Sequence, residues 1–384
     1  MLHIQSSYGG LFLPLSGIKV AKEGATIVGV PKEATNCARN NVVFAVVSPD
    51  RAQTYREHKQ KVTSQEARLT VSADETVYCN ARYLGAVPAL SIGSPYYRDD
   101  PTGWVNALAN DPRAGDVEIV LVDDGSGDAE VDSKVRAAVD AWPGPAIVVR
   151  FHNNKGRAQA RNRGIRAARG SYLLFIDADM LPGDHLYLSR YFDVIDKDAS
   201  AIVFGGFTTL GVKVDRDTKL NHSLALKNDC KSANDRAMRG PLSVASNNLL
   251  VRRDVFDYER FDDAFVGWGW EDTEWAMRAV YAGYGLTHID NPAVHIGLDS
   301  SSAVLRKYKE AGPNLRRLLD RHPEGAQMAG AKLAKFLAKT PGHSWLRPIC
   351  SWMAMDPEGV VPMNVRRLAT KYWRASFAAD ALNA

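Results

Sequence analysis

The sequence predicts an α/β domain with a doubly wound, mostly parallel sheet. Four short, nearly continuous apolar runs are the first observation; they are VPALSI (87–92), VEIVLVD (117–123), AIVVRF (146–151) and SYLLFID (171–177). Segments with helical spacing separate these runs, among them VDSKVRAAVDAW and RAQARNRGIRAARG. Apolar strands that alternate with helices indicate a parallel sheet covered on both faces. Ligands bind beyond the carboxyl ends of the strands in such sheets, so function is sought there.

Two further zones flank this α/β domain, which we place at residues 86–305. Residues 1–85 carry short apolar stretches broken by Gly, Pro and Asn, which predicts a small β-rich module of unknown role. Residues 306–384 combine helical spacing with 14 Lys and Arg residues against 6 Asp and Glu residues. They predict a basic, mostly helical extension. It presents either a solvated helical face or a surface for an anionic partner such as nucleic acid, lipid head groups or an acidic glycan.

The composition argues against several other classes of protein. No apolar run approaches the roughly 20 residues of a membrane-spanning helix. The N-terminal residues MLHIQSSYGG lack the charged-then-apolar layout of a signal peptide. We therefore expect a cytoplasmic protein that is at most peripherally attached to a membrane. The cysteines are scattered and form no CxxC pair, so neither a disulfide framework nor a thiolate zinc site is expected.

Two acids end the fourth apolar run. Asp177 and Asp179 are two residues apart, and such residues point to the same side of an extended chain. Two carboxylates that are open to solvent can hold Mg²⁺ or Mn²⁺, which prefer oxygen ligands and keep waters and substrate phosphates in their shell. We expect Asp179 to contact the metal and Asp177 to serve the donor sugar. The alternative is a cap for the next helix, but Asp184 is better placed for that role.

The segment NNKGRAQARNRGI after the third run is basic and begins a helix. Arg157 and Arg161 lie one turn apart and share a helix face. The start of a helix also carries a positive partial charge. We therefore expect Lys155, Arg157 and Arg161 to stabilise a nucleotide diphosphate, unless the segment is a solvated basic helix. Three other arginines are expected to face solvent, namely Arg163, Arg166 and Arg169.

The segment FVGWGWEDTEWAMRAVYAGYG (265–285) combines a glycine-rich loop with two large aromatic side chains. Trp268 and Trp270 offer flat surfaces that suit the C–H faces of sugar rings. Glu271 and Asp272 open a helix, where acids complement the helix dipole. One of them can take a proton from an acceptor hydroxyl while the other binds or orients the acceptor.

Two histidines follow in THIDNPAVHIG, namely His288 and His295. A neutral imidazole can complete a metal shell. We favour His295 for this role, whereas a structural role is the alternative for both residues.

Five motifs, in this order, resemble the family-2 glycosyltransferases with the GT-A fold; they are SPYYR, VDDGS, NKGRAQARNRGI, DAD and GWGWED. The resemblance covers roughly residues 88–297. It implies an inverting transfer of a sugar, usually from a UDP-sugar, assisted by Mn²⁺ or Mg²⁺. The GWGWED segment looks like the acceptor loop of β-1,4-galactosyltransferases and chondroitin-polymerase-type enzymes.

The resemblance also implies roles for single residues. Tyr96 to Arg98 and Asp124 border the base and ribose, with Asp123 close by. Asp177 and Asp179 are the DxD pair, and Asp272 is the catalytic base. His295 corresponds loosely to a downstream metal ligand. The sequence has Ser94-Pro95-Tyr96-Tyr97 where the family commonly has Pro-Thr-Tyr-Asn, so the base contacts differ there.

The sequence leaves the acceptor and two rival activities open. A glycan or polysaccharide is the default acceptor, and the basic extension allows a nucleic-acid acceptor such as a hydroxylated DNA base. A nucleotidyltransferase of similar fold would release pyrophosphate, but the glycine-rich loop it needs after the first strand is absent from SIGSPYYRDD. A binding module without catalysis is the third hypothesis.

Overall fold

The structure is a computed structural model that describes residues 12–14, 44–46, 71–85, 87–198 and 200–384. Within these residues, β1 (Phe12–Pro14) and β2 (Phe44–Val46) pair antiparallel. Most of the β-rich module expected in residues 1–85 lies outside the described residues.

A central sheet of eight strands in the order β12-β9-β11-β7-β4-β5-β6-β3 organises the α/β domain. The four expected strands are present and pair in parallel; they are β4 (Leu90–Tyr96), β5 (Val117–Asp123), β6 (Ala146–Phe151) and β7 (Tyr172–Ile176). The sheet continues through β9 (Ile202–Phe204), β11 (Asn248–Arg252) and β12 (Leu286–His288). Because β11 runs antiparallel to β7 and β9, the sheet is mixed. The predicted α/β class is confirmed.

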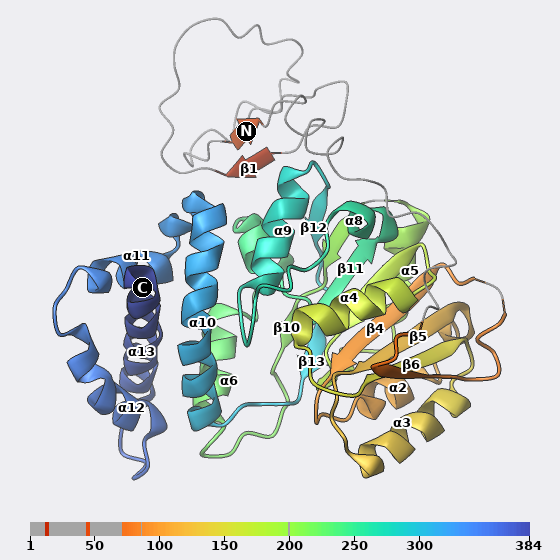
Figure 1. The fold of residues 1–384 in the computed structure, drawn as a ribbon, viewed down its shortest axis with the longest axis horizontal. Helices are drawn as coiled ribbons and strands as arrows, with labels where there is room; N and C mark the ends of the chain where they lie inside the picture. Colours follow the sequence, from red (N-terminus) through yellow and green to blue (C-terminus); the bar gives the residue numbers. More distant parts are fainter. Residues whose placement is uncertain (1–11, 15–43, 47–70, 86, 199) are drawn as a thin grey trace, which may run out of the picture.

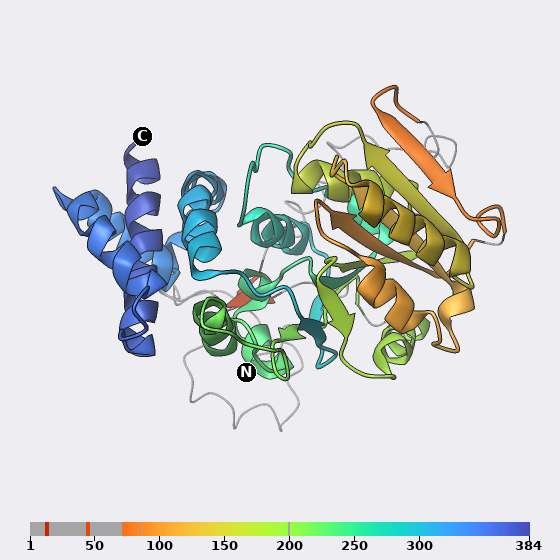
Figure 2. The ribbon, with the colours of Figure 1, turned by 90° about the horizontal axis from the view of Figure 1, so that it is seen from below.

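Helices cover both faces of this sheet (Figures 1 and 2). One core contains side chains of α2 (Thr102–Leu108), α3 (Ala129–Ala141) and α5 (Tyr187–Asp196). The other core contains side chains of α4 (Arg157–Ala167), α8 (Arg253–Tyr258) and α9 (Glu271–Tyr281). Strand β5 shows why both cores form, because its successive side chains alternate between them. Ile119 and Leu121 enter the first core, whereas Val120 and Val122 enter the second.

A small second sheet lies next to the end of β7. It has three strands in the order β10-β13-β8, which are β10 (Phe207–Thr208), β13 (Ala293–His295) and β8 (Met180–Pro182). Strands β13 and β8 pair antiparallel, with His295 opposite Met180. This pairing brings the chain after residue 293 to the turn that contains Asp177 and Asp179.

Strand β3 (Glu75–Cys79) extends the central sheet at its edge by pairing antiparallel with β6. The sheet therefore begins before residue 86, where we placed the start of the α/β domain. The Arg163 side chain on α4 is buried, and its Nη2 lies 2.8 Å from Oε1 of Glu75. Burial opposes ionisation of Glu75, but hydrogen bonds from Arg163 prevail and lower its pKa.

Two of the arginines expected to face solvent are therefore placed differently. Arg163 is held by Glu75, and Nε of Arg169 lies 2.6 Å from Oε1 of the buried Glu118 on β5. Each guanidinium compensates a carboxylate that the sheet removes from water. The expectation of solvent exposure was wrong for these two and is confirmed for Arg166.

Replacing Glu75 with Gln should destabilise the fold by about 3–5 kcal/mol, because the buried Arg163 would lose its counterion. The free energy of unfolding, measured by urea titration, checks this. Glu130→Gln is the matched control, since Glu130 forms a surface pair with Lys134 on α3. An unchanged free energy of unfolding in Glu75→Gln would contradict the position of β3.

The C-terminal extension is helical, as expected, and lies beside the α/β domain (Figure 1). Its helices are α10 (Ser301–Arg321), α11 (Ala329–Ala338), α12 (Arg347–Met355) and α13 (Met363–Asn383). Helix α13 packs against the other three. Two more helices, α6 (Lys219–Asn228) and α7 (Ala233–Ala237), lie in the chain between β10 and β11. Leu220 and Leu224 of α6 share an apolar core with Val304 and Leu305 of α10. Among the described residues, no helix is long and apolar enough to cross a membrane.

Candidate active site

The acids at the end of β5 fix the neighbouring loops. Asp123 accepts hydrogen bonds from the backbone N of Ser126 at 2.8 Å and from Nε of Arg150 at 3.0 Å. Asp124 accepts from the backbone N of Lys155 at 2.6 Å and of Gly156 at 2.9 Å. Burial raises the pKa of Asp124 in spite of these two hydrogen bonds. The VDDGS motif therefore shapes the edge of the sheet where β5 and β6 end.

Tyr96, Arg98 and Lys155, which are expected to bind the nucleotide sugar, have different environments in the structure. Tyr96 is buried in the core, and its hydroxyl has no hydrogen-bond partner among the described residues. Arg98 is exposed, and its backbone N donates to Oγ of Ser126 at 2.7 Å. The Lys155 ammonium pairs with Asp74, just before β3. The structure thus brings the exposed Arg98 to the mouth of the VDDGS loop, while Lys155 is held toward β3.

Asp179 and His295 meet where β8 and β13 pair. Nε2 of His295 lies 3.0 Å from Oδ2 of Asp179, and the backbone N of Ile296 donates to the Asp179 carbonyl at 2.9 Å. Burial opposes ionisation of both groups, but their contact lowers the pKa of Asp179 and raises that of His295. Gly297 is required here, because a Cβ at that position would lie 2.3 Å from Oδ2 of Asp179.

This pair fits two ligands of an octahedral divalent cation. Adjacent ligands at about 2.1 Å from Mg²⁺ or Mn²⁺ lie about 3.0 Å apart, which is the Asp179–His295 separation. Within the described part of the chain, no group of three or more His, Cys, Asp or Glu residues could hold a metal. A cation held here would therefore take its other ligands from substrate oxygens and water, as Mg²⁺ commonly does.

Further charged groups surround this pair. Asp99 follows β4, and burial together with the Asp179 charge raises its pKa. Nζ of Lys307 on α10 lies 2.6 Å from Oδ2 of Asp299 and lowers the pKa of Asp179 electrostatically. Asp99, Asp299 and Lys307 were not predicted from the sequence, because each comes from a different segment and none belongs to a recognisable motif.

Arg161 lies between the acids of the DAD motif and those of the GWGWED motif. Its side chain is 2% exposed. Nη1 lies 3.1 Å from Oε1 of Glu271 and 3.1 Å from Oδ1 of Asp272, and Nη2 lies 3.7 Å from Oδ1 of Asp177. Burial disfavours the charged guanidinium, but the three carboxylates prevail and raise the pKa of Arg161. We expected Arg161 to face a diphosphate; in the structure it contacts the acids on either side.

Glu271 and Asp272 differ in environment, as their positions on α9 require. Glu271 is 5% exposed, and burial together with the Asp272 charge raises its pKa. Asp272 is more open, at 19% side-chain exposure, and its Oδ2 accepts a hydrogen bond from the backbone N of Ser246 at 3.0 Å. Of the two acids, Asp272 is therefore the one that can meet a substrate hydroxyl.

The two tryptophans of the loop before α9 contact the C-terminal extension. The rings of Trp268 and Tyr308 on α10 lie 5.7 Å apart. The Arg374 guanidinium on α13 lies 4.9 Å from the Trp270 ring centroid and 4.8 Å from that of Tyr308. The Asp229 side chain is partly open to solvent, but protein atoms surround most of it. This burial raises its pKa to about 6, although the charge of Arg374 acts in the opposite direction. The basic composition of the extension predicted only a surface role, and these contacts were not expected.

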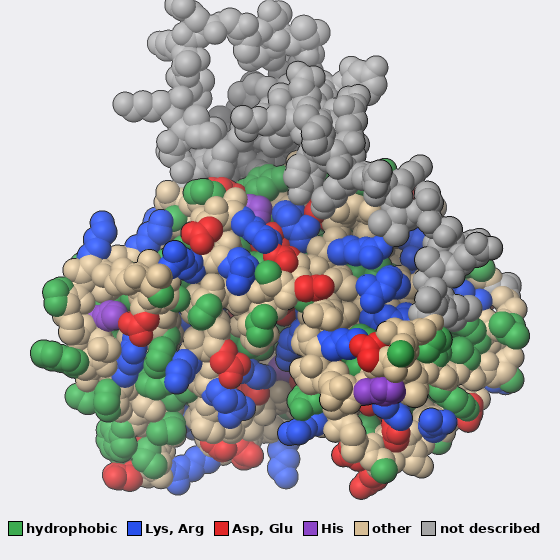
Figure 3. Space-filling view, viewed as in Figure 1, with side chains coloured by type: hydrophobic (Ala, Val, Ile, Leu, Met, Phe, Trp, Pro, Cys, Tyr) green, Lys and Arg blue, Asp and Glu red, His purple; other side chains and the backbone are tan. Residues whose placement is uncertain are grey.

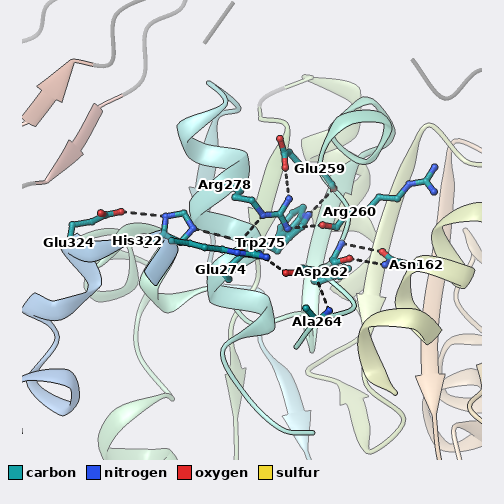
Figure 4. Close-up of polar contacts among 12 residues, drawn as sticks. Asn162, Glu259, Arg260, Asp262, Ala264, Glu274, Trp275, Arg278, His322 and Glu324 are labelled. Carbon is teal, nitrogen blue, oxygen red and sulfur yellow. Dashed lines mark hydrogen bonds and ion pairs between the residues drawn. The ribbon is translucent and has the colours of Figure 1, made fainter. Parts of the chain in front are cut away.

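A buried polar network fixes α9 behind the candidate site (Figure 4). The Glu274 carboxylate is fully buried; Nε of Arg278 lies 2.7 Å from it and Nη1 of Arg321 lies 3.1 Å from it. Arg321 also contacts Asp262 at 2.5 Å. Burial opposes ionisation of Glu274, but hydrogen bonds from His322 and Arg278 lower its pKa to about 2. The network ties α10 to the helix that carries Asp272.

Comparisons with known proteins find similarity to glycosyltransferases. The model for Glycosyl transferase family 2 matches residues 104–258. The chain is 33% identical over 87 residues to the glycosyltransferase GlyG of Streptococcus pneumoniae, a match that covers 23% of this chain and 28% of that protein. It is 29% identical over 215 residues to the glycosyltransferase AglE of Haloferax volcanii, covering 52% of this chain and 64% of that protein. The chain thus spans less than two thirds of either relative.

The fold has a solved counterpart. The mannosyltransferase PcManGT from Pyrobaculum calidifontis, in complex with GDP-Man and Mn²⁺, superposes with a TM-score of 0.51 at 15% identity. The match covers 87% of this chain and 93% of that chain, and it shows the fold alone. Part of this chain is thus similar to the family-2 glycosyltransferases, and the structure shares the fold of a solved mannosyltransferase.

Proposed function

We propose that this protein transfers a hexose, most readily from a UDP-sugar, to a hydroxyl group of a glycan or polysaccharide. The transfer is a single displacement that inverts the anomeric carbon. The observation that carries this proposal is the position of Arg161, which contacts Asp272 at 3.1 Å and Asp177 at 3.7 Å. Arg161 thereby holds Asp272, which is suited to an acceptor hydroxyl, close to the Asp177 and Asp179 pair, which is suited to the donor.

The metal belongs on the donor side of this site. Asp179 and His295 would hold Mn²⁺ or Mg²⁺, since their 3.0 Å separation fits adjacent ligands. Such an ion offsets the negative charge that develops on the departing nucleoside diphosphate. PcManGT, which has the same fold, is described with GDP-Man and Mn²⁺.

Asp272 is the proposed general base. It lies in the first turn of α9, where the helix dipole and Arg161 place positive charge beside the carboxylate. Oδ2, the carboxylate oxygen that is not buried against Arg161, takes the proton from the acceptor hydroxyl as the hydroxyl oxygen attacks the anomeric carbon. The bond from that carbon to the diphosphate oxygen breaks at the same time, and the electron pair leaves with the diphosphate.

The remaining site residues are assigned to the two substrates. Asp177 binds the donor sugar, and Arg98 at the mouth of the site borders the nucleotide. The loops held by Asp123 and Asp124 complete that border. Tyr96, Lys155 and Arg161 are also assigned to the nucleotide-sugar side, although the structure buries Tyr96 and Arg161. Trp268 and Trp270, together with Glu271, form the acceptor side. A nucleic-acid acceptor finds no support in the comparisons.

The metal assignment predicts that Asp179→Asn weakens Mn²⁺-dependent binding of UDP-sugars by at least about tenfold, because the ion loses a carboxylate ligand. Calorimetric titration of UDP, UDP-sugars and GDP-sugars with and without Mn²⁺ measures this. Asp193→Asn, at an exposed position on α5, is the matched control. Equal nucleotide affinity with and without Mn²⁺ in the unchanged protein would reject the metal site.

A further inference from the structure

Helix α12 presents an uncharged face to solvent. Arg347 is its only charged residue, and that guanidinium is bound to Asp380 at 2.6 Å and to the Ser376 carbonyl at 2.8 Å, both on α13. On the solvent side, Ile349 is 51% exposed and Trp352 is 43% exposed. A surface helix ordinarily carries polar residues on that side, and a contiguous apolar surface marks an interaction site.

The same apolar surface continues into the turn before α12. Trp345 is 83% exposed, and Leu346 and Met355 are also exposed. We call these five residues the apolar row; they are Trp345, Leu346, Ile349, Trp352 and Met355. Hydrophobic side chains gather at the lower left of the space-filling view, where Figure 1 shows α12 (Figure 3). Tryptophan is the residue type that concentrates at the boundary between lipid and water.

A stripe of lysines lies on the preceding helix. Lys332 and Lys335 on α11, and Lys339 directly after its end, are spaced three and four residues apart, so they lie on one side of the helix. All three are exposed, as is Phe336 between them, and none forms an ion pair with another described residue. We call these three residues the lysine stripe. Only five residues separate Lys339 from Trp345 in the sequence, so the stripe leads directly into the apolar row.

The balance of charge around these features is positive. Residues 329–384 contain 8 Lys and Arg residues but 3 Asp and Glu residues. One of the acids, Asp380, is bound by Arg347, and another, Asp356, is buried and lies 3.5 Å from Arg366. Glu358 is exposed and forms no ion pair with another described residue. The lysine stripe is therefore largely uncompensated and attracts an anionic surface.

We propose that α11 and α12 dock on the surface of a bilayer that contains anionic lipids. The apolar row enters the boundary between head groups and acyl chains, and the lysine stripe binds the lipid phosphates. Stable attachment to a bilayer surface generally needs two such signals, and this extension carries both. The inference does not depend on the proposed function, because none of these residues belongs to the candidate site.

Charge and side-chain chemistry favour a bilayer over the other occupants. A second copy of this chain would bring one lysine stripe toward another, and the like charges would repel. A nucleic acid would bind the lysines but would leave the aliphatic Ile349, Leu346 and Met355 in water. A bilayer surface satisfies both features, since anionic phosphates lie directly above an apolar layer.

Flotation of the full chain with vesicles tests the proposal. The protein should float with vesicles of phosphatidylcholine and phosphatidylglycerol, should float poorly with phosphatidylcholine alone, and should be released as the salt concentration rises. A Trp345→Ser, Trp352→Ser double variant should bind at least about tenfold less, and so should a variant with all three stripe lysines changed to Gln. Leu84→Ser, which removes an exposed leucine outside the extension, is the control.

Three results would overturn the proposal. One is absence of flotation with either vesicle, and another is undiminished flotation of both variants. The third is a dimer in vesicle-free solution that the tryptophan variant dissociates, which would assign the apolar row to a second copy. The lysine variant keeps the test decisive if the tryptophan variant fails to fold, because it changes only exposed side chains.

Discussion

Asp272→Asn is expected to bind nucleotide sugars as well as the unchanged protein does and to lose about 10²–10⁴-fold in turnover. Asparagine keeps the shape of the side chain and can still accept the hydrogen bond from the backbone N of Ser246. It cannot take a proton from the acceptor hydroxyl, so only the chemical step should fail. The measurement is a comparison of donor affinity with the rate of nucleoside diphosphate release.

The control for this variant is Asp320→Asn, which neutralises an exposed acid on α10 and should leave turnover unchanged. Glu271→Gln separates the two neighbouring acids. Glu271→Gln should slow turnover less than loss of the base does, because Arg161 keeps Asp177 and Asp272 as partners. Full transfer by Asp272→Asn would show that another group takes the proton.

Arg161→Met should have the second large effect, on stability and on pH dependence together. The change leaves Asp177, Glu271 and Asp272 without their shared cation. Removing one partner of a buried ion pair typically costs about 3–5 kcal/mol of folding free energy. Urea unfolding measures this cost, and Arg166→Met on the exposed side of the same helix should show little of it.

The direction of the pH effect follows from the charges. Arg161 lowers the pKa of Glu271, although burial and Asp272 raise it overall. Without the guanidinium, Glu271 should protonate at higher pH. The acid limb of the rate profile should therefore move to higher pH in Arg161→Met, and Arg161→Lys should return it part of the way. A variant that is destabilised but has an unchanged profile would give Arg161 a purely structural role.

The fold could be anticipated from the sequence where the signal is local. Buried strands β4 to β7 read as continuous apolar runs, and the helix that follows GWGW begins at Glu271 as expected. The antiparallel strand β11 gives no comparable signal, because the direction of a strand depends on which neighbour it pairs with. Strand β3 was assigned to another module for the same reason, since its partner β6 is about 70 residues away.

The candidate site could likewise be predicted only where its residues belong to one contiguous motif. Asp177, Asp179 and Asp272 belong to contiguous motifs, so the sequence alone could nominate them. The contacts between motifs are made in three dimensions, such as the link of Arg161 to Asp272 over 111 residues of chain. The importance of Gly297 follows only from its close approach to Asp179 in the structure. A lone glycine gives no such indication in a single sequence.

The acceptor side was the hardest to anticipate. Tyr308 and Arg374 come from helices that read only as basic and amphipathic, yet they contact Trp268 and Trp270. The helical extension therefore contributes to the surface beside the candidate site. Part of its basic charge lies in the lysine stripe, away from these contacts, and serves the separate proposal of binding to an anionic surface.

The most direct test of the account is a proton NMR time course of the protein with Mn²⁺ and a panel of α-linked UDP- and GDP-sugars. Water or an added glycan serves as the acceptor. We predict that nucleoside diphosphate appears together with a sugar that is initially in the β configuration, because the displacement inverts the anomeric carbon. Formation of pyrophosphate, retention of the α configuration, or no turnover of any donor would contradict the account.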